Sequence, residues 1–351
     1  MSRRAILVVG MHRSGTSATA RVLNLLGVPL PGELVPGFEG NPLGHWEPER
    51  IVHLHDAMLR DAGSNVNSVF GVDPRWFDTA SAARFGDAIR AFVDEEAGGA
   101  GLFAVKDPRL SLFLPLWRRV LERAGVQPSY VLAVRDPAAV AASLTARQLS
   151  AFPDAVWPRG RADLLWLRYS LTAERDTREG PRAVLAYDRL LGDWRGETRR
   201  IARQLGLAWP RDEAAAAPEL DTFLHPGRGD GLDEDSVLPW TEAVYAALLA
   251  ACEDPVSGRE TLDLAFAALN DACALFQPYV SGLERRIATT PLRTEYGHFG
   301  EPPAPSPPDT PALAREHAQA DALRARLAAL EASRSWRITA PLRAAVRQLP
   351  K

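Results

Sequence analysis

Short apolar runs alternate with longer amphipathic stretches along roughly the first 205 residues of the chain. Four apolar runs have the length and composition of buried strands: 5–9, 102–105, 130–134 and 183–187. Helical patterns lie between or after them, at 18–26, 48–60, 138–146 and 197–205 and around Leu116, Val120 and Leu121. Asp188 stands where it is expected to cap the helix at 197–205. Residues 206–240 are loop-rich, and helical patterns return at 242–252 and 262–287. This alternation predicts a three-layer α/β/α domain with a central parallel sheet.

A glycine-framed segment, GMHRSGTS at residues 10–17, joins the first strand to the first helix. Gly10 and Gly15 have the spacing of an ATPase phosphate loop, but Thr16 occupies the lysine position of that motif and the cation is Arg13. A helix N-terminus offers unpaired N–H groups to an anion, so a P-loop-like site is predicted here. The missing lysine argues against ordinary phosphoryl transfer from a nucleoside triphosphate. The residues expected to hold the anion are Arg13, Ser14, Gly15, Thr16 and Ser17.

A second polar pair follows the apolar run at 130–134. Arg135 stands at the end of this run, and Pro137 marks the start of the next helix. Ser143 comes eight residues after Arg135, about two helical turns into that helix. Functional residues at the carboxyl ends of parallel strands are typical of ligand sites in α/β sheets.

These two motifs, in this order, resemble the PAPS-dependent sulfotransferase family, where PAPS is 3′-phosphoadenosine 5′-phosphosulfate. The resemblance covers about residues 5–205 and extends to bacterial enzymes that modify carbohydrates and cell-surface polysaccharides. It implies that Arg13 and residues 14–17 hold the 5′-phosphosulfate, while Arg135 and Ser143 hold the 3′-phosphate. Arg228, in a Gly-rich segment at 225–231, matches a basic loop over the 3′-phosphate. Its glycines equally suit ordinary turns.

Sulfuryl transfer to a hydroxyl needs a base for the acceptor proton and cations for the charge on the leaving phosphate. Arg13 is the expected stabiliser of the leaving group. Glu47, in the block NPLGHWEP at 41–48, is the first choice as base, because the resembled family includes such a block and commonly uses a glutamate. Glu33 and His45 remain alternatives, and Glu47 equally suits a cap for the helix that begins beside it.

Lys106 and Asp107 follow the apolar run at 102–105. They either face the transferring group and its acceptor or form an ion pair that closes the strand. His53 and His55 lie two residues apart on a predicted helix and therefore point to different faces. The sequence predicts no metal site.

Composition places these motifs in one large domain, predicted at 1–288, of a chain of 351 residues that is 46% apolar and 24% charged. No apolar run approaches the ~20 residues of a membrane-spanning helix. Two cysteines, Cys252 and Cys273, form no disulfide framework and suit a reducing compartment. The expected location is therefore the cytoplasm.

The C-terminal part of the chain has a different composition. Residues 289–311 contain seven prolines and read as a linker. Residues 312–351 carry eight lysines or arginines and three acids, a charge of +5, so the rest of the chain carries −8 and does not suit nucleic acid. We expect 312–351 to be a basic amphipathic helical tail that contacts the inner membrane surface through Trp336 and Ile338, a glycan-assembly enzyme, or a dimer mate.

The sequence thus predicts a sulfotransferase that moves a sulfuryl group from PAPS to a hydroxyl of a carbohydrate or surface-polysaccharide precursor. The carbohydrate acceptor is inferred from residues 333–343, which resemble tails of bacterial enzymes of polysaccharide assembly. Two alternatives remain open. One is a P-loop-type kinase of a small molecule, and the other is a non-catalytic nucleotide-binding scaffold in glycan assembly.

Overall fold

A parallel sheet of four strands forms the centre of the computed structural model, which describes residues 3–37, 44–151, 160–224 and 238–289. The strands are β1 (Arg3–Val9), β2 (Leu102–Lys106), β3 (Val126–Val134) and β4 (Arg182–Ala186), in the order β2-β1-β3-β4. Every neighbouring pair runs parallel. The carboxyl ends of β1 and β2 therefore lie side by side, with Val8 opposite Lys106.

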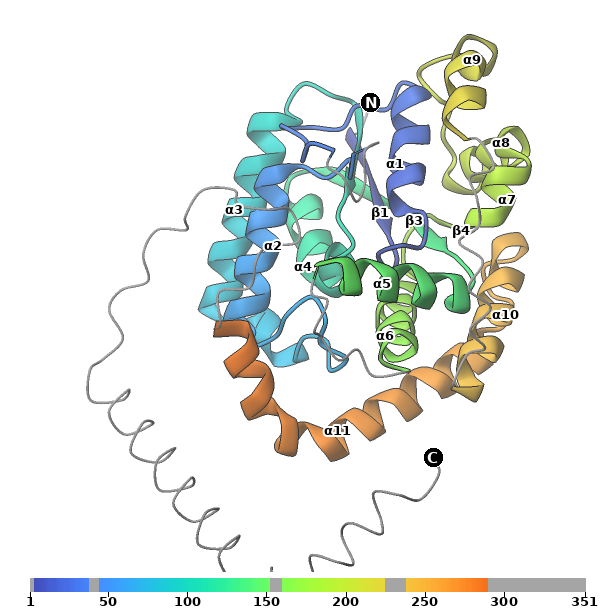
Figure 1. Cartoon of the computed structure of the whole chain (residues 1–351). Helices are drawn as coiled ribbons and strands as arrows, with labels where there is room; N and C mark the ends of the chain where they lie inside the picture. The colour runs from blue at the N-terminus through green and yellow to red at the C-terminus, as the bar shows by residue number, and fades with distance from the viewer. Residues whose placement is uncertain (1–2, 38–43, 152–159, 225–237, 290–351) are drawn as a thin grey trace, which may run out of the picture. The chain divides into compact units, whose positions relative to one another are not determined.

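Side chains alternate between the two faces of the sheet, and each face has its own hydrophobic core. Along β1, Ala5, Leu7 and Val9 enter one core, while Ile6 and Val8 enter the other. Helices cover both faces, so the domain has the three-layer α/β/α architecture that the sequence predicts (Figure 1). Because both faces are covered, the strands are apolar almost throughout rather than alternating.

One layer consists of α1 (Thr16–Leu25), α7 (Tyr187–Gly192), α8 (Trp194–Leu205) and α9 (Glu213–Phe223). The other contains α2 (Glu49–Asp61), α3 (Ala80–Glu96), α4 (Leu110–Arg123), α5 (Pro137–Ala151), α6 (Arg161–Asp176), α10 (Pro239–Glu253) and α11 (Arg259–Thr289). A short 3₁₀ helix, η1 (Pro74–Asp78), precedes α3. Figure 1 shows α2 and α3 side by side against this second face.

Two expectations at the level of elements are wrong. Asp188 does not cap α8 but lies in the first turn of α7, and the cap is Asp193, whose carboxylate accepts a hydrogen bond from Gly196 N–H at 2.9 Å. The stretch at 206–240, expected to be loop-rich without a helix, contains α9 behind the cap Asp212. Four consecutive alanines with high helix propensity, at 214–217, follow its first residue and favour the helical conformation.

The C-terminal part of the domain is helical, as the sequence pattern predicts. Cys252 on α10 is buried, and Cys273 on α11 is half-buried. Within the described ranges, none of the helices combines the length and the apolar character needed to cross a membrane. The predicted tail at 312–351, and all but the first residue of the predicted linker, lie outside the described residues.

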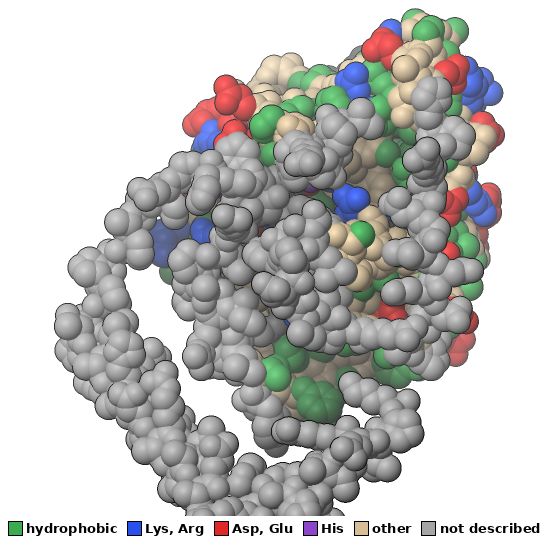
Figure 2. All heavy atoms as spheres, viewed as in Figure 1, with side chains coloured by type: hydrophobic (Ala, Val, Ile, Leu, Met, Phe, Trp, Pro, Cys, Tyr) green, Lys and Arg blue, Asp and Glu red, His purple; other side chains and the backbone are tan. Residues whose placement is uncertain are grey.

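Charges of both signs are intermixed on the surface of α8 and α9, at the upper right of Figure 2. The ion pairs of Arg195 with Asp221 at 3.0 Å and of Arg199 with Glu213 at 2.7 Å join these two helices. Exposed pairs of this kind contribute at most about 1 kcal/mol each. The apolar core, rather than these pairs, therefore holds α9 in place.

Candidate active site

The segment between β1 and α1 forms a tight loop at the carboxyl edge of the sheet. Gly10 has φ 130°, and a side-chain Cβ there would lie 2.3 Å from Ala133 O of the neighbouring strand. Arg13 has φ 68°, in a region that non-glycine residues seldom adopt. Gly15 ends the loop in the left-handed conformation, and α1 begins at Thr16. The first N–H groups of α1 thus face the loop and suit an anion.

The two predicted half-motifs meet at this loop. Arg13 Nε donates a hydrogen bond to Ser143 Oγ at 2.9 Å, although 130 residues separate them. Arg135 Nη1 donates to the carbonyl oxygen of Arg13 at 3.3 Å. Ser14 Oγ is buried and has no hydrogen-bond partner among the described residues. Two guanidinium groups and two hydroxyls therefore converge where the sequence predicts the nucleotide phosphates.

Tyr187, which the sequence analysis did not select, packs between these groups. A Cβ on Gly15 would lie 2.3 Å from Tyr187 Cδ2, and Arg135 Cζ lies 5.2 Å from the centre of the tyrosine ring. Such a cation–π contact restricts the orientation of the guanidinium. Tyr187 follows β4 directly, so its place at a strand end was the available signal for it.

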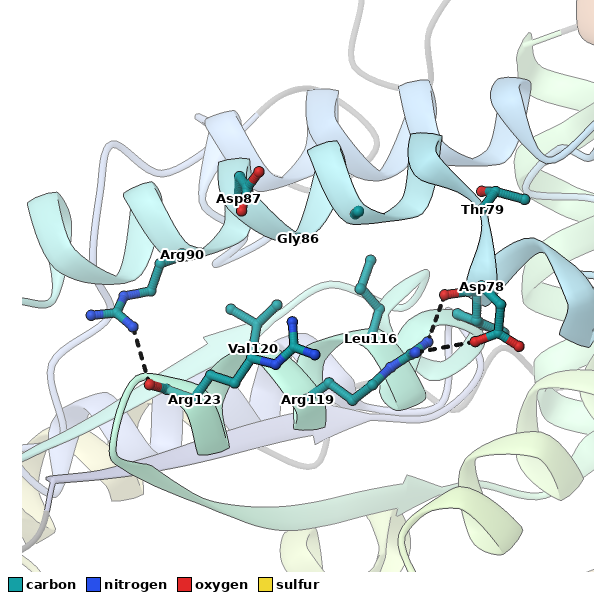
Figure 3. A pocket seen from close by; sticks show the side chains of 11 residues that line it. Asp78, Thr79, Gly86, Asp87, Arg90, Leu116, Arg119, Val120 and Arg123 are labelled. Carbon is teal, nitrogen blue, oxygen red and sulfur yellow. Dashed lines mark hydrogen bonds and ion pairs between the residues drawn. The ribbon is translucent and has the colours of Figure 1, made fainter.

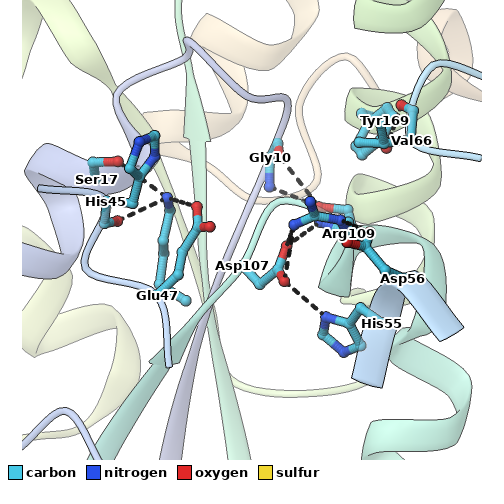
Figure 4. A network of polar contacts seen from close by, with 12 residues as sticks. Gly10, Ser17, His45, Glu47, His55, Asp56, Val66, Asp107, Arg109 and Tyr169 are labelled. Carbon is cyan, nitrogen blue, oxygen red and sulfur yellow. Dashed lines mark hydrogen bonds and ion pairs between the residues drawn. The ribbon is translucent and has the colours of Figure 1, made fainter. Parts of the chain in front are cut away.

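The end of β2 brings a second set of predicted residues to the loop. Lys106 Nζ donates hydrogen bonds to Ser17 Oγ and to the carbonyl oxygen of His45, each at 3.0 Å, and forms a short ion pair with Glu47 Oε1 (Figure 4). Lys106 and Glu47 are both buried. Lys106 thus pairs with Glu47 rather than with Asp107. The N-cap residue of α2 is Pro48, and Glu47 lies one residue before it.

The buried carboxylates near Lys106 have different environments. Burial raises the pKa of Glu47 above its usual range, and the positive charge of Lys106 opposes this effect. Burial also acts on Asp107, but Arg109 and a hydrogen bond from His55 outweigh it and hold the pKa of Asp107 well below its usual range. Glu47 is therefore the better proton acceptor of the two, because Asp107 stays ionised and engaged.

Two other predicted residues have no described contact with the phosphate loop. Glu33 is exposed, and its carbonyl oxygen accepts a hydrogen bond from Glu49 N–H at 2.8 Å. Arg228 lies outside the described residues. In the part of the chain that the structure describes, no group of three His, Cys, Asp or Glu residues could hold a metal ion. His53 is exposed and His55 is buried, so they do point to different faces.

A pocket of about 450 Å³ lies elsewhere, between α3 and α4 (Figure 3). Gly86 opens it, because a Cβ there would lie 3.4 Å from Leu116 Cδ1 and from Val120 Cγ2. Arg119 and Arg90 on its rim donate to the carbonyl oxygens of Phe77 at 2.8 Å and Arg123 at 3.3 Å. Its lining comes from residues 77–90 and 116–123, and none of the predicted site residues is among them.

The fold and this site define an α/β protein of the phosphate-loop kind, with its polar residues at the carboxyl edge of the sheet. A family model described as "Sulfotransferase family" matches residues 5–211, more than half of the chain. The chain therefore belongs to the sulfotransferase family and is a sulfotransferase.

Two solved structures are similar to the chain. One is the sulfotransferase STF1 from Mycobacterium tuberculosis H37Rv, with 15% identity, a TM-score of 0.38, and coverage of 63% of this chain and 72% of that one. The other is the sulfotransferase domain of the olefin synthase from Synechococcus PCC 7002, with 19% identity, a TM-score of 0.36, and coverage of 78% and 95%. No curated protein matches the sequence.

Proposed function

We propose that this sulfotransferase uses PAPS and transfers its sulfuryl group to a hydroxyl of a carbohydrate or surface-polysaccharide precursor. The observation that carries the proposal is the contact between Arg13 and Ser143, which joins the two phosphate motifs at the N-terminus of α1. The Glu47–Lys106 pair lies beside them, linked through Ser17. Cations, N–H donors and a buried carboxylate are thus available at one edge of the sheet.

The residues at the loop fit the donor. The buried Ser14 hydroxyl has no partner within the described residues, and the first N–H groups of α1 point at the same anion site. Arg13 and residues 14–17 would hold the 5′-phosphosulfate, and Arg135 and Ser143 the 3′-phosphate. Tyr187 keeps Arg135 in place. The donor supplies the activated sulfuryl group.

The transfer needs one base and one stabilised leaving group. Glu47 takes the proton of the acceptor hydroxyl as its oxygen forms the new bond to sulfur. The bond from sulfur to the bridging phosphate oxygen breaks, and its electron pair stays on the phosphate as 3′,5′-adenosine bisphosphate leaves. Arg13 and Lys106 neutralise the negative charge that develops on that oxygen. One preorganised donor of this kind is typically worth about 3 kcal/mol in the transition state.

Calorimetric titration with 3′,5′-adenosine bisphosphate, against ATP with magnesium, tests the donor. We expect binding of the bisphosphate, loss of that binding in Arg135→Ala, and no comparable binding of ATP. Binding of ATP alone would favour the small-molecule kinase. Binding of neither would favour the non-catalytic scaffold. Arg13→Ala should abolish sulfuryl transfer while leaving the protein folded.

Single replacements of Glu33, His45 and Glu47 test the base. Glu47→Gln should lose turnover by a factor of ~100 or more while keeping its affinity for the bisphosphate. Glu33→Gln should stay active, because the side chain is exposed and its described contact is a backbone one. Full activity of Glu47→Gln would exclude Glu47 as the base and leave His45 as the next candidate.

The acceptor and the tail remain predictions. We propose a glycan acceptor because residues 333–343 resemble tails of polysaccharide-assembly enzymes. The same tail is proposed to bring a cytoplasmic enzyme to the inner membrane surface, to an assembly enzyme, or to a dimer mate. Transfer of radiolabelled sulfate from PAPS to a panel of oligosaccharides, compared with phenols and small alcohols, tests the acceptor class. Labelling of phenols alone would overturn it.

A further inference from the structure

The turn between β2 and α4 contacts three parts of the candidate active site at once. Lys106, at the end of β2, pairs with Glu47. Asp107, the next residue, is fully buried and bonds to α2. Ser111, in the first turn of α4, bonds to the start of the phosphate loop. Positions 106–111 are therefore the common neighbour of the base, of the helix behind it and of the loop.

Asp107 joins this turn to α2 through His55. His55 Nδ1 lies 3.1 Å from Asp107 Oδ2, and Trp117 Nε1 lies 2.8 Å from His55 Nε2. An indole nitrogen only donates, so Nε2 of His55 must accept. Nδ1 then carries the proton and donates it to Asp107. The tautomer of His55 is thus fixed from both sides inside the core, and Figure 4 shows its contact with Asp107.

Arg109 adds a second connection between the same two elements. Its N–H donates to Asp107 Oδ1 at 2.8 Å, its Nη1 lies 3.0 Å from the same oxygen, and its Nε lies 2.7 Å from Asp56 Oδ1 on α2. Asp107 and Arg109 are both buried. Two neighbouring residues of α2, His55 and Asp56, are thus bonded to the turn that carries Lys106.

These polar contacts between α2 and the turn fix the position of Glu47 relative to Lys106. Glu47 lies just before α2, and Lys106 just before Asp107. A shift of α2 against β2 would move the carboxylate and the ammonium group relative to each other. A displacement of about 1 Å at a catalytic group can reduce the rate about 100-fold.

Ser111 connects the same turn to the loop. Gly10 N–H donates to Ser111 Oγ at 2.9 Å, and the hydroxyl lies 3.3 Å from the carbonyl oxygen of Gly10. Both polar groups of the first loop residue are therefore engaged by one buried side chain. Because Gly10 has a backbone conformation with φ 130°, this contact selects the path on which the loop leaves β1.

We propose that Asp107, His55 and Ser111 are positioning residues for sulfuryl transfer. Asp107 and His55 hold Glu47 against Lys106, and Ser111 holds the phosphate loop. This inference rests on the proposed function, but it predicts different effects for the two sets of contacts. Loss of the His55–Asp107 contact lowers kcat at unchanged nucleotide affinity. Loss of the Ser111–Gly10 contact weakens nucleotide binding.

Matched variants of the full-length chain separate the effects of these two contacts. His55→Leu fills the same space without polar atoms, and His55→Asn can still donate to Asp107. We expect a kcat about 30- to 100-fold lower in His55→Leu and mostly restored in His55→Asn, with the dissociation constant of the bisphosphate within about 3-fold of that of the parent. Ser111→Ala should raise that constant about 10-fold. Ser129→Ala is the control for Ser111→Ala. Ser129 is a buried serine of β3 that accepts a hydrogen bond from Arg4, and its replacement should change neither kcat nor the dissociation constant.

Hydrogen exchange of the unliganded protein tests the inference without activity. His55→Leu should speed exchange at residues 44–48 and leave residues 10–17 unchanged, and Ser111→Ala should do the reverse. The inference is overturned if the two variants show the same exchange pattern, or if His55→Leu keeps the parental kcat. If the two variants divide in this way but the parent neither binds the bisphosphate nor transfers a sulfuryl group, only the proposed function is contradicted.

Discussion

Gly15 has no room for a side chain. Its φ of 87° lies in the left-handed region, and a Cβ would lie 2.3 Å from the Tyr187 ring. The tyrosine cannot retreat without releasing Arg135, whose guanidinium lies over the same ring. One glycine therefore sets the spacing between the phosphate loop and the residue proposed for the 3′-phosphate.

Replacement of Gly15 by alanine should disrupt binding and stability together. We expect the affinity for 3′,5′-adenosine bisphosphate to fall by at least about 10-fold. The free energy of unfolding should fall by about 2 kcal/mol, because the new methyl group contacts the ring and the backbone is strained. Calorimetry and urea unfolding measure the two effects. Gly99→Ala is the control, since nothing lies within 4 Å of its Cβ position. Unchanged binding in Gly15→Ala would contradict the described loop.

The raised pKa of Glu47 predicts a pH dependence of activity. A base must be deprotonated, so kcat should fall as the pH drops through the pKa of Glu47, which burial places above the usual carboxyl range. Lys106 opposes that rise, so Lys106→Met should move the acid limb to higher pH while lowering the rate. Single-turnover rates between pH 5 and 8 measure the acid limb in the parent and in Lys106→Met. A limb that stays in place without the lysine would show that another group titrates.

At the scale of elements, the sequence pattern locates helices better than it locates their caps. The apolar pattern at 197–205 predicts α8, but the helix begins at Trp194, whose indole Nε1 donates to Asp221 on α9 at 2.8 Å. Asp193 rather than Asp188 accepts the N–H of Gly196. Both aspartates precede the apolar pattern of α8. Because Asp188 lies inside the short helix α7, only Asp193 is free to cap α8.

Asp193→Ala should therefore destabilise the protein by about 1 kcal/mol, the usual cost of losing an N-cap. Asp188→Ala is a matched control at the residue that the sequence favoured. It should change stability by less than about 0.5 kcal/mol, because an exposed residue in the first turn contributes only through the helix dipole. Chemical denaturation of both variants measures the difference. The reverse order of effects would contradict the assigned helix start.

Asp176 ends α6 and predicts a pH dependence of stability. Burial raises its pKa to about 6, and the nearby cations Arg175 and Arg118 compensate only in part. The folded carboxyl keeps its proton up to about pH 6, while an unfolded one loses it near pH 4. The folded state binds more protons, so stability falls as the pH rises from about 4 to about 6, by at most about 3 kcal/mol.

Asp176→Asn should reduce that loss and raise the melting temperature at pH 7. Thermal unfolding of the variant and the parent at pH 4.5 and pH 7 measures the effect. Glu179→Gln is a useful comparison, because Glu179 is exposed and pairs with Arg118. An equal pH dependence in the parent and in Asp176→Asn would show that the carboxyl titrates as an exposed group does.

At the scale of the whole molecule, the core residues that the structure describes lie between Ala5 and Leu269. The predicted domain boundary near residue 288 thus leaves both cores intact. A chain that ends at residue 289 should bind 3′,5′-adenosine bisphosphate with the affinity of the full chain and unfold at a similar temperature. Vesicle sedimentation of the two proteins tests the tail. Loss of nucleotide binding in the shortened chain would show that the tail belongs to the domain.

Local sequence determined the strands, the phosphate loop and the pairing of each polar residue with a strand end. Apolar runs, glycine spacing and Pro137 are local signals, and they place Arg13, Lys106, Arg135 and Ser143 at the carboxyl edge of a parallel sheet. The helices α3 and α6 did not enter that account.

Only the tertiary structure decided which polar groups meet. Glu47 and Lys106 are 59 residues apart, and His55 and Asp107 are 52 apart. The sheet order brings each pair into a dry interior where a charge must find a partner. Sequence spacing carries no information about that encounter, since burial and distance between remote segments arise only from packing. The chemical role of each site residue could therefore be predicted from the sequence. The contacts that assemble the site, such as Tyr187 with Gly15 and Ser111 with Gly10, were decided by the fold.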